Sequence, residues 1–377
     1  MTVSMWQEEA QPPERVSHDV VVVGAGIVGS HAARVLAAAG KDTAIVEARF
    51  VAAGASGRNA GFVHLGVHLL YAEAVRQLGR KQARELWAMT KENMSRLRGL
   101  AGELGVPCED KGATFVSFDE RERAEFKESA RLAQEDGFDI EFVDGNPLGI
   151  GLRGAMVQPG DFTTQPAAMT EALARTSGAT LYENDEMVSV RRKGGGLTVR
   201  TRQHEIRCEK ALLAVDGFAP GVHPFFKGLV EPWRAEVLVT EPLARITGTI
   251  ARIRGKFSFQ QLADGRLLAG AGAKPVRGNA HRDEPTPSGQ RAIEGFVREH
   301  LSLDGYAVSK RWAGTLGVTR DFLPVIGRLP GDGEVYFAVG FSGAGNSLGL
   351  VTGERTVEMM LEGRDPGVLG VERLLGT

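Results

Sequence analysis

Residues 19–29 read DVVVVGAGIVG, a β-branched run that leads directly into a glycine-rich turn. The first five of these residues are typical of a strand buried on both faces of a sheet. The alanine-rich segment Ser30–Ala39 predicts a helix, and Gly40 is a suitable residue to end it. A second short strand is expected over Thr43–Val46, followed by Glu47. Any glycine turn can imitate GxGxxG, but a strand, helix, strand and acid in this order indicate a dinucleotide-binding unit rather than a structural turn.

Each residue of this unit has a physical role. Gly24 allows the tight turn, and Gly26 lets the backbone approach a pyrophosphate. Gly29 lets the helix pack closely on the strand, and the helix N-terminus offers free N–H groups to the phosphates. Glu47 is expected to accept a hydrogen bond from a ribose hydroxyl, and its charge disfavours a 2′-phosphate, so NADP is not expected.

The composition excludes several classes of protein. The chain has 377 residues with 49 Gly, 42% hydrophobic residues and no three-residue glycine period, so it is neither collagen-like nor disordered. Its 45 Lys+Arg balance 47 Asp+Glu, which gives no indication of nucleic-acid binding. Cys108 and Cys208 have no metal-ligand spacing and are expected to be reduced thiols. We see no signal peptide or membrane span, and we expect a cytoplasmic protein.

A second glycine-rich loop follows Glu47. Residues 53–61 read AGASGRNAG, in which Arg58 is the one cation. The loop is either a flexible surface turn or backbone that lines a flat cofactor. In the second interpretation Arg58 lies near a phosphate or a substrate charge.

Two further segments that carry motif residues lie near the C-terminus. Residues 312–314 read WAG and residues 319–327 read TRDFLPVIG. A strand is expected over Val335–Val339, then the turn GFSGAGN at 340–346, then a helix over about Ser347–Leu361.

These blocks and their order resemble the D-amino-acid oxidase (DAO) superfamily of FAD-dependent oxidoreductases, which includes glycine oxidase, sarcosine oxidase and γ-glutamylputrescine oxidase. The resemblance extends from about Asp19 to Asp365. It implies non-covalent FAD, because residues 312–315 contain no cysteine. It also implies that the last helix points its N-terminus at the flavin and that the backbone of Val188 contacts adenine. The expected FAD-binding residues are Gly24, Ala25, Gly26, Ile27, Val28, Gly29, Glu47, Ala48, Ser56, Arg58, Asn59, Ala60, Gly61, Val188, Gly314, Gly343, Ala344, Gly345 and Asn346.

The resemblance implies an α/β (α+β) fold in which a Rossmann-like FAD-binding lobe is interleaved with a mainly antiparallel-sheet substrate lobe. The expected FAD-binding lobe comprises residues 18–95, 150–217 and 312–365. The expected substrate-binding lobe comprises residues 96–149 and 218–311.

The resemblance implies oxidation of a C–N bond in an amine or amino acid by hydride transfer to flavin N5, followed by hydrolysis of the imine. Such chemistry needs orientation more than a strong acid or base. Glycine oxidases hold the substrate carboxylate with arginines at two positions, which here carry Leu316 and Gly345 or a neighbour. Arg58 and Arg320 are the cations that we consider as substitutes. The catalytic residue remains unknown, with His64, Arg58, Arg320 and Gln261 as candidates.

Several aromatic and histidine residues have two interpretations. Trp233, Phe257 and Phe259 either line the substrate site or pack in the core. His64 and His68 are four residues apart, but no third ligand follows, so we expect no metal site.

Two alternative functions remain. One is a dehydrogenase of the same fold that passes electrons to a quinone or a partner subunit. The other is a flavin-binding subunit of a hetero-oligomer without its own turnover. The sequence does not identify the amine or amino acid, the electron acceptor (oxygen or another) or the oligomeric state.

Overall fold

The structure, a computed structural model, describes residues 13–276 and 283–375. The helices are α1 (Ile27–Ala38), α2 (Ala55–Arg58), α3 (Tyr71–Leu78), α4 (Arg80–Glu103), α5 (Glu120–Glu135), α6 (Pro166–Arg175), α7 (Ala219–Val222), α8 (Pro287–Leu301), α9 (Gly345–Glu362) and α10 (Glu372–Leu375), with 3-10 turns at Asp216–Phe218, Pro224–Phe226 and Gly367–Leu369. The strands up to the middle of the chain are β1 (Glu14–Ser17), β2 (Val20–Val23), β3 (Thr43–Val46), β4 (Phe62–Val63), β5 (Cys108–Asp110), β6 (Ala113–Phe115), β7 (Glu141–Val143), β8 (Ala155–Gln158), β9 (Phe162–Thr164) and β10 (Thr180–Tyr182). The remaining strands are β11 (Met187–Lys193), β12 (Gly196–Thr201), β13 (His204–Cys208), β14 (Lys210–Leu213), β15 (Glu231–Pro242), β16 (Ile250–Ile253), β17 (Phe257–Gln261), β18 (Arg266–Pro275), β19 (Val308–Val318), β20 (Val325–Arg328) and β21 (Val335–Val339).

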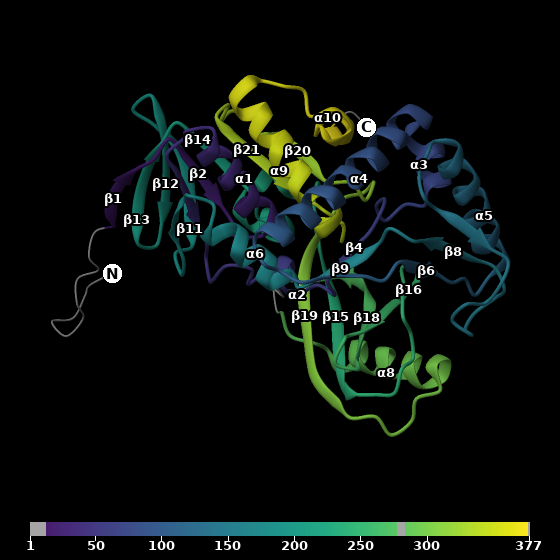
Figure 1. Cartoon of the computed structure of the whole chain (residues 1–377). Coiled ribbons are helices and arrows are strands. Elements are labelled where there is room, and N and C mark those ends of the chain that lie inside the picture. Colours follow the sequence, from purple (N-terminus) through teal and green to yellow (C-terminus); the bar gives the residue numbers. More distant parts are fainter. Residues whose placement is uncertain (1–12, 277–282, 376–377) are drawn as a thin grey trace.

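A six-stranded sheet in the order β10-β3-β2-β14-β21-β20 forms the centre of one of the two main parts of the molecule (Figure 1). Its strands pair in parallel except for β20 with β21. All four valines of β2 are buried, because the strand is central and covered on both faces. Helix α1 packs against α6 and α9, and α4 lies across α9. The predicted strand–turn–helix–strand unit is thus confirmed.

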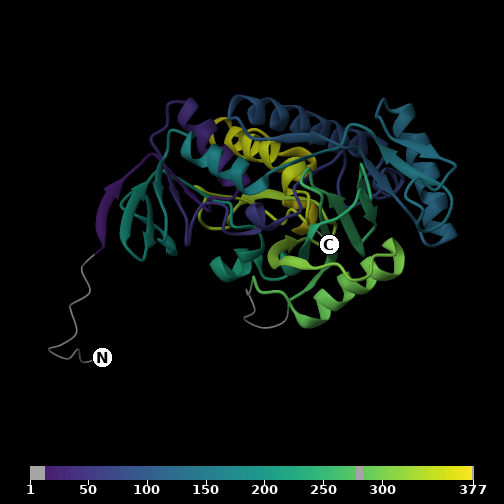
Figure 2. The same cartoon turned by 60° about the horizontal axis from the view of Figure 1, so that its bottom comes forward.

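An eight-stranded sheet in the order β19-β15-β18-β17-β16-β6-β8-β7 forms the other main part of the molecule. We refer to it as the second sheet. It is antiparallel except where β16 pairs in parallel with β6, which joins residues near 113 to residues near 250. Helix α8 lies against this sheet (Figure 2), and its Ile293, Phe296 and Val297 belong to the hydrophobic core that the helix forms with the sheet. The mixed α/β fold class is confirmed. The predicted lobe boundaries stay a prediction; the eight-stranded sheet includes β8 and the whole of β19, whose first residues precede 312.

Two small sheets complete the fold. Strands β11 and β12 form a hairpin, whose tip contains Gly194 and Gly195 with positive φ angles. Strands β13 and β1 extend this hairpin into a four-stranded sheet, and β4-β9-β5 form a three-stranded sheet. In both views the four-stranded sheet and α5 lie at opposite ends of the molecule (Figures 1 and 2). Within the described ranges, we find no helix with both the length and the apolar character needed to cross a membrane.

Candidate active site

One cavity of about 710 Å³ extends from the glycine-rich turn after β2 to the eight-stranded sheet. Residues of the turn, of the loop around α2, of the turn before α9 and of strands β6, β8, β15 and β16 line it. Segments that are far apart in sequence therefore surround one space. Trp233, Phe257, His64 and His68 are among the lining residues.

The glycine-rich turn has no space for side chains. Gly24 has a φ of +107°, and a Cβ there would lie 2.5 Å from the carbonyl oxygen of Ala214. A Cβ on Gly29 would lie 2.0 Å from the carbonyl oxygen of Gly24, which confirms the close helix–strand packing expected of this glycine. A Cβ on Gly26 would lie 3.0 Å from Ser56 Oγ. Helix α1 begins here without a side-chain cap from Gly26, so its N-terminus presents backbone groups to the cavity.

Glu47 organises the turn from the end of β3. Its Oε2 accepts a hydrogen bond from the N–H of Ala25 at 2.9 Å, and its Oε1 accepts one from Arg49 at 3.0 Å. Glu47 and Ala48 also line the cavity. A carboxylate has about four acceptor positions, so Glu47 keeps capacity for a ribose hydroxyl.

The second glycine-rich loop is not an exposed surface turn. It forms the short helix α2, and Arg58 connects it to β19. Arg58 Nε donates to the carbonyl of Ala53 at 3.0 Å, and its Nη1 donates to the carbonyl of Ala313 at 3.0 Å. Trp312 Nε1 donates to the carbonyl of Arg58 at 2.9 Å. Arg58 lines the cavity, but much of its hydrogen-bonding capacity is used within the protein.

The turn before α9 meets this loop. Gly343 has a φ of +90°, where a left-handed backbone favours glycine. Asn346, at the start of α9, donates from Nδ2 to Asn59 Oδ1 at 3.0 Å and to the carbonyl of Phe62 at 3.2 Å. Two of the predicted FAD-binding clusters are therefore joined by a side-chain contact.

Asp216 is a residue of the site whose role the sequence did not indicate. Its carboxylate accepts hydrogen bonds from the N–H groups of Gly317 (2.8 Å), Gly340 (3.0 Å) and Phe341 (3.0 Å). Burial raises its pKa, and these backbone hydrogen bonds act in the opposite direction. Asp216 thus holds the ends of β14, β19 and β21 together beside the cavity.

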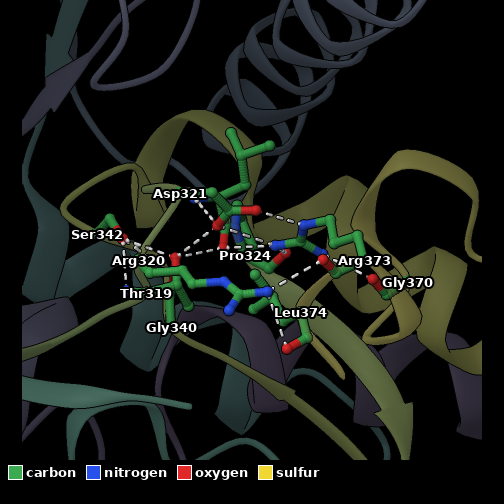
Figure 3. A network of polar contacts seen from close by, with 10 residues as sticks. Thr319, Arg320, Asp321, Pro324, Gly340, Ser342, Gly370, Arg373 and Leu374 are labelled. Carbon is green, nitrogen blue, oxygen red and sulfur yellow. Dashed lines mark hydrogen bonds and ion pairs between the residues drawn. The ribbon is translucent and has the colours of Figure 1, made fainter. Parts of the chain in front are cut away.

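Arg320 is placed away from the cavity, and its role as a substitute for a carboxylate-binding arginine stays a prediction. Its Nη2 donates to the carbonyl of Leu374 at 3.0 Å, beside the ion pair of Asp321 with Arg373 (Figure 3). Arg320 is not among the described residues that line the cavity. The turn over Thr319–Phe322 directs Phe322 into the cavity and Arg320 toward the C-terminal segment.

Gln261 is hydrogen-bonded within the second sheet and is absent from the described cavity lining; its catalytic role stays a prediction. Its Oε1 accepts from the N–H of Ile246 at 2.7 Å, and its Nε2 donates to the carbonyls of Ala244 and Gly265 at 2.9 Å. Phe259 is also absent from the described cavity lining and is buried in the core under α8. Both side chains therefore stabilise the second sheet.

The adenine contact of Val188 stays a prediction. Its side chain is exposed, and the neighbouring Glu186 and Met187 line the cavity instead.

Near the second sheet, the cavity wall carries several buried polar groups. Burial, and after it the nearby Arg252 guanidinium, lowers the pKa of His64. Burial and Arg254 lower the pKa of His68 to about 4, and its ring stacks on Phe322 at 4.6 Å. Both histidines are therefore neutral at pH 7. Asp161 is not among the described residues that line the cavity; burial raises its pKa to about 8.

The sequence analysis missed Asp161, Arg252 and Gln158. Asp161 Oδ1 accepts from the N–H of Leu65 at 2.9 Å, and Gln158 Nε2 donates to the carbonyl of Leu65 at 3.2 Å. These two residues fix the segment that carries His64. For Arg252, a charged residue inside the short apolar strand Ile250–Ile253 was the available signal, whereas Asp161 lies between β8 and β9 without such a pattern. The described residues contain no group of three or more potential metal ligands.

Comparison with known proteins agrees with this geometry. Residues 19–359 match the family described as DAO, FAD dependent oxidoreductase. Glycine oxidase of Bacillus licheniformis is 28% identical over 370 residues, which cover 92% of this chain and 94% of that protein. The gamma-glutamylputrescine oxidoreductase of Escherichia coli K12 is 25% identical over 92% of this chain and 84% of its own length. The solved glycine oxidase of Geobacillus kaustophilus shares the fold, with a TM-score of 0.81, 21% identity and coverage of 96% of this chain and 99% of that one. The protein therefore belongs to the DAO family of FAD-dependent oxidoreductases.

Proposed function

We propose that this protein oxidises the C–N bond of an amine or amino acid. The supporting observation is that a single cavity joins the glycine-rich turn to a chamber lined by aromatic and apolar side chains of the second sheet. The names of the relatives, glycine oxidase and gamma-glutamylputrescine oxidoreductase, support the same class of substrate.

The chemistry that FAD supplies when bound is acceptance of a hydride from the carbon of the C–N bond, after which the resulting imine is hydrolysed. The turn Gly24–Gly29 would hold the pyrophosphate, and Glu47 would hold the ribose. The turn before α9, with Asn346, would hold the flavin end. His64 and His68 are both neutral at pH 7. They would therefore place no positive charge beside the neutral form of a bound amine.

An anaerobic screen of amines and amino acids tests this function. We expect at least one compound to bleach the flavin absorbance of the purified protein without oxygen. If nothing in a broad panel reduces the flavin, the proposal is wrong and a flavin-binding subunit without turnover is favoured. Subsequent mixing with air separates an oxidase, which releases peroxide, from a dehydrogenase, which does not.

A further inference from the structure

Arg252 is a cavity-lining cation that forms no hydrogen bond or ion pair through its side chain within the described part of the chain. It lies on β16, where it pairs with Phe115 of β6 and Ser258 of β17. Its guanidinium carbon lies 4.8 Å from the centre of the Phe115 ring. Its Nη1 atom is shielded from solvent and has no hydrogen-bond partner among the described residues. A buried arginine without a partner is costly, so this position calls for an anion.

Arg254, two residues further on, provides the contrast. It forms a two-pronged ion pair with Glu73, with nitrogen–oxygen distances of 2.8 and 2.5 Å. Both arginines line the same cavity, but the charge of Arg254 is already neutralised. Only the charge of Arg252 is left without a direct counter-ion among these groups.

The remaining ionisable groups near Arg252 do not neutralise it. His64 and His68 are neutral at pH 7, as described above, and they carry no negative charge in either form. Asp161 is the nearby acid; burial raises its pKa to about 8 while Arg252 acts in the opposite direction, and no hydrogen bond or ion pair joins the two side chains. Its Oδ2 atom also lacks a hydrogen-bond partner among the described residues. Among the described residues, the guanidinium of Arg252 therefore has no acid paired directly with it.

We infer that Arg252 binds a carboxylate of the substrate, so that the substrate is an amino acid rather than a simple amine. This inference rests on the proposed function and specifies its substrate class. A guanidinium fork matches a carboxylate in a planar, two-bond arrangement, which favours this anion over others. Phe115, which lies against the guanidinium, and its strand neighbour Met156 are apolar and strengthen such a pair by excluding water. Arg252, rather than Arg58 or Arg320, is thus the arginine that binds the substrate carboxylate. The guanidinium groups of Arg58 and Arg320 already donate to backbone carbonyls.

Titration of the FAD-loaded protein with acetate and with benzoate tests the inference without turnover. Binding beside the flavin is read from the change in the flavin absorption spectrum. We expect Arg252→Gln to raise the dissociation constant of the carboxylate roughly 10- to 100-fold. Arg252→Lys, which keeps the charge and loses the fork, should give an intermediate value. Arg254→Gln is the matched control, and we expect it to change the constant by less than about 3-fold.

Turnover supplies the second readout. Proline and pyrrolidine, or N-methylglycine and dimethylamine, differ only by the carboxylate, and flavin reduction should prefer the acid in wild type. The preference should be lost in Arg252→Gln. Inorganic phosphate is the comparison anion and should compete more weakly than acetate.

Separate outcomes overturn the inference and the proposed function. If amines reduce the flavin but no carboxylate perturbs its spectrum, the inference is wrong and the function stands. The inference is also wrong if Arg252→Gln retains carboxylate affinity, or if phosphate binds better than carboxylates. If Arg252→Gln loses FAD, the titration is made with Arg252→Lys, and unchanged carboxylate affinity there refutes the fork arrangement. If carboxylates bind but no amine or amino acid reduces the flavin, the proposed function is wrong.

Discussion

The carboxylate of Glu47 accepts a hydrogen bond from the backbone N–H of Ala25, at 2.9 Å and across 22 residues of sequence. This contact ties the end of β3 to the middle of the glycine-rich turn. Both residues line the cavity, so the acid shapes the turn, and we propose that its remaining acceptor positions hold a ribose hydroxyl.

Glu47→Ala should therefore weaken FAD binding. Loss of a charge-assisted hydrogen bond costs about 1.5–3 kcal/mol, which corresponds to roughly a 10- to 100-fold higher dissociation constant. The measurement is titration of the apoprotein with FAD. Glu209→Ala, at an exposed position before β14, is the control and should leave the constant unchanged. Equal affinity in Glu47→Ala and wild type would show that Glu47 does not contact the cofactor.

Gly26→Val should abolish the yellow colour of the purified protein. A Cβ at this position lies 3.0 Å from Ser56 Oγ, and the two methyl groups of valine extend into the space proposed for the pyrophosphate. Gly99→Ala is a matched control, because nothing lies within 4 Å of a Cβ there and the residue is in helix α4. That control should keep its FAD and gain about 0.5–1 kcal/mol of stability. Stoichiometric FAD in Gly26→Val would refute the position of the pyrophosphate.

The sequence predicted the Rossmann-like unit well because each part of it is local. Four consecutive valines, a glycine turn and an alanine-rich helix carry their own structural preferences, and β2, α1 and β3 lie within two or three residues of the predicted bounds. The second sheet was less accessible. Its parallel pairing of β16 with β6 brings residue 252 beside residue 115, and no local pattern encodes that register.

The polar residues of the candidate site also differ in this way: a local sequence pattern predicts the position of some of them, and only the fold determines the position of others. Arg58 and Asn346 lie in glycine-rich segments, and both line the cavity as expected. Arg320 lies in an equally suggestive motif, but the direction of its turn depends on long-range contacts with residues 373 and 374. Arg252 has no motif around it, so only the fold reveals that it lines the cavity without a hydrogen-bond partner in the described part of the chain.

Asn93→Ala should destabilise the packing of α4 on α9. The buried side-chain amide of Asn93 donates to the carbonyl of Asn346 at 2.8 Å and accepts from the N–H of Leu350 at 2.9 Å. Loss of these buried side-chain hydrogen bonds should cost about 1–3 kcal/mol of unfolding free energy, measured by denaturant titration, and should weaken FAD binding through Asn346.

Thr352→Val is the control for that variant on the same helix. The hydroxyl of Thr352 is buried without a hydrogen-bond partner among the described residues, so its removal should be neutral or stabilising. If Thr352→Val loses as much stability as Asn93→Ala, α9 is sensitive to any substitution in its packing. The hydrogen bonds of Asn93 would then have no specific role.

Asp161 should make the stability of the protein depend on pH. Burial raises its pKa from 3.8 to about 8, so between these values the folded state holds a proton that the unfolded state has released. The free energy of unfolding therefore falls as pH rises through this range, with a slope of about 1.4 kcal/mol per pH unit from this one group. The contribution is fully present below about pH 4 and is lost as pH rises through about 8.

Asp161→Asn isolates this contribution, because an amide oxygen can still accept the hydrogen bond from Leu65 while the titration is removed. Denaturant unfolding of both proteins at pH 5, 6, 7 and 8, at the same FAD concentration, gives the difference in stability at each pH. We expect wild type to lose stability relative to Asp161→Asn as pH rises. A difference that is constant across this range would show that Asp161 is ionised in the folded protein. Arg252 would then have a negatively charged neighbour, which would weaken its attraction for the substrate carboxylate.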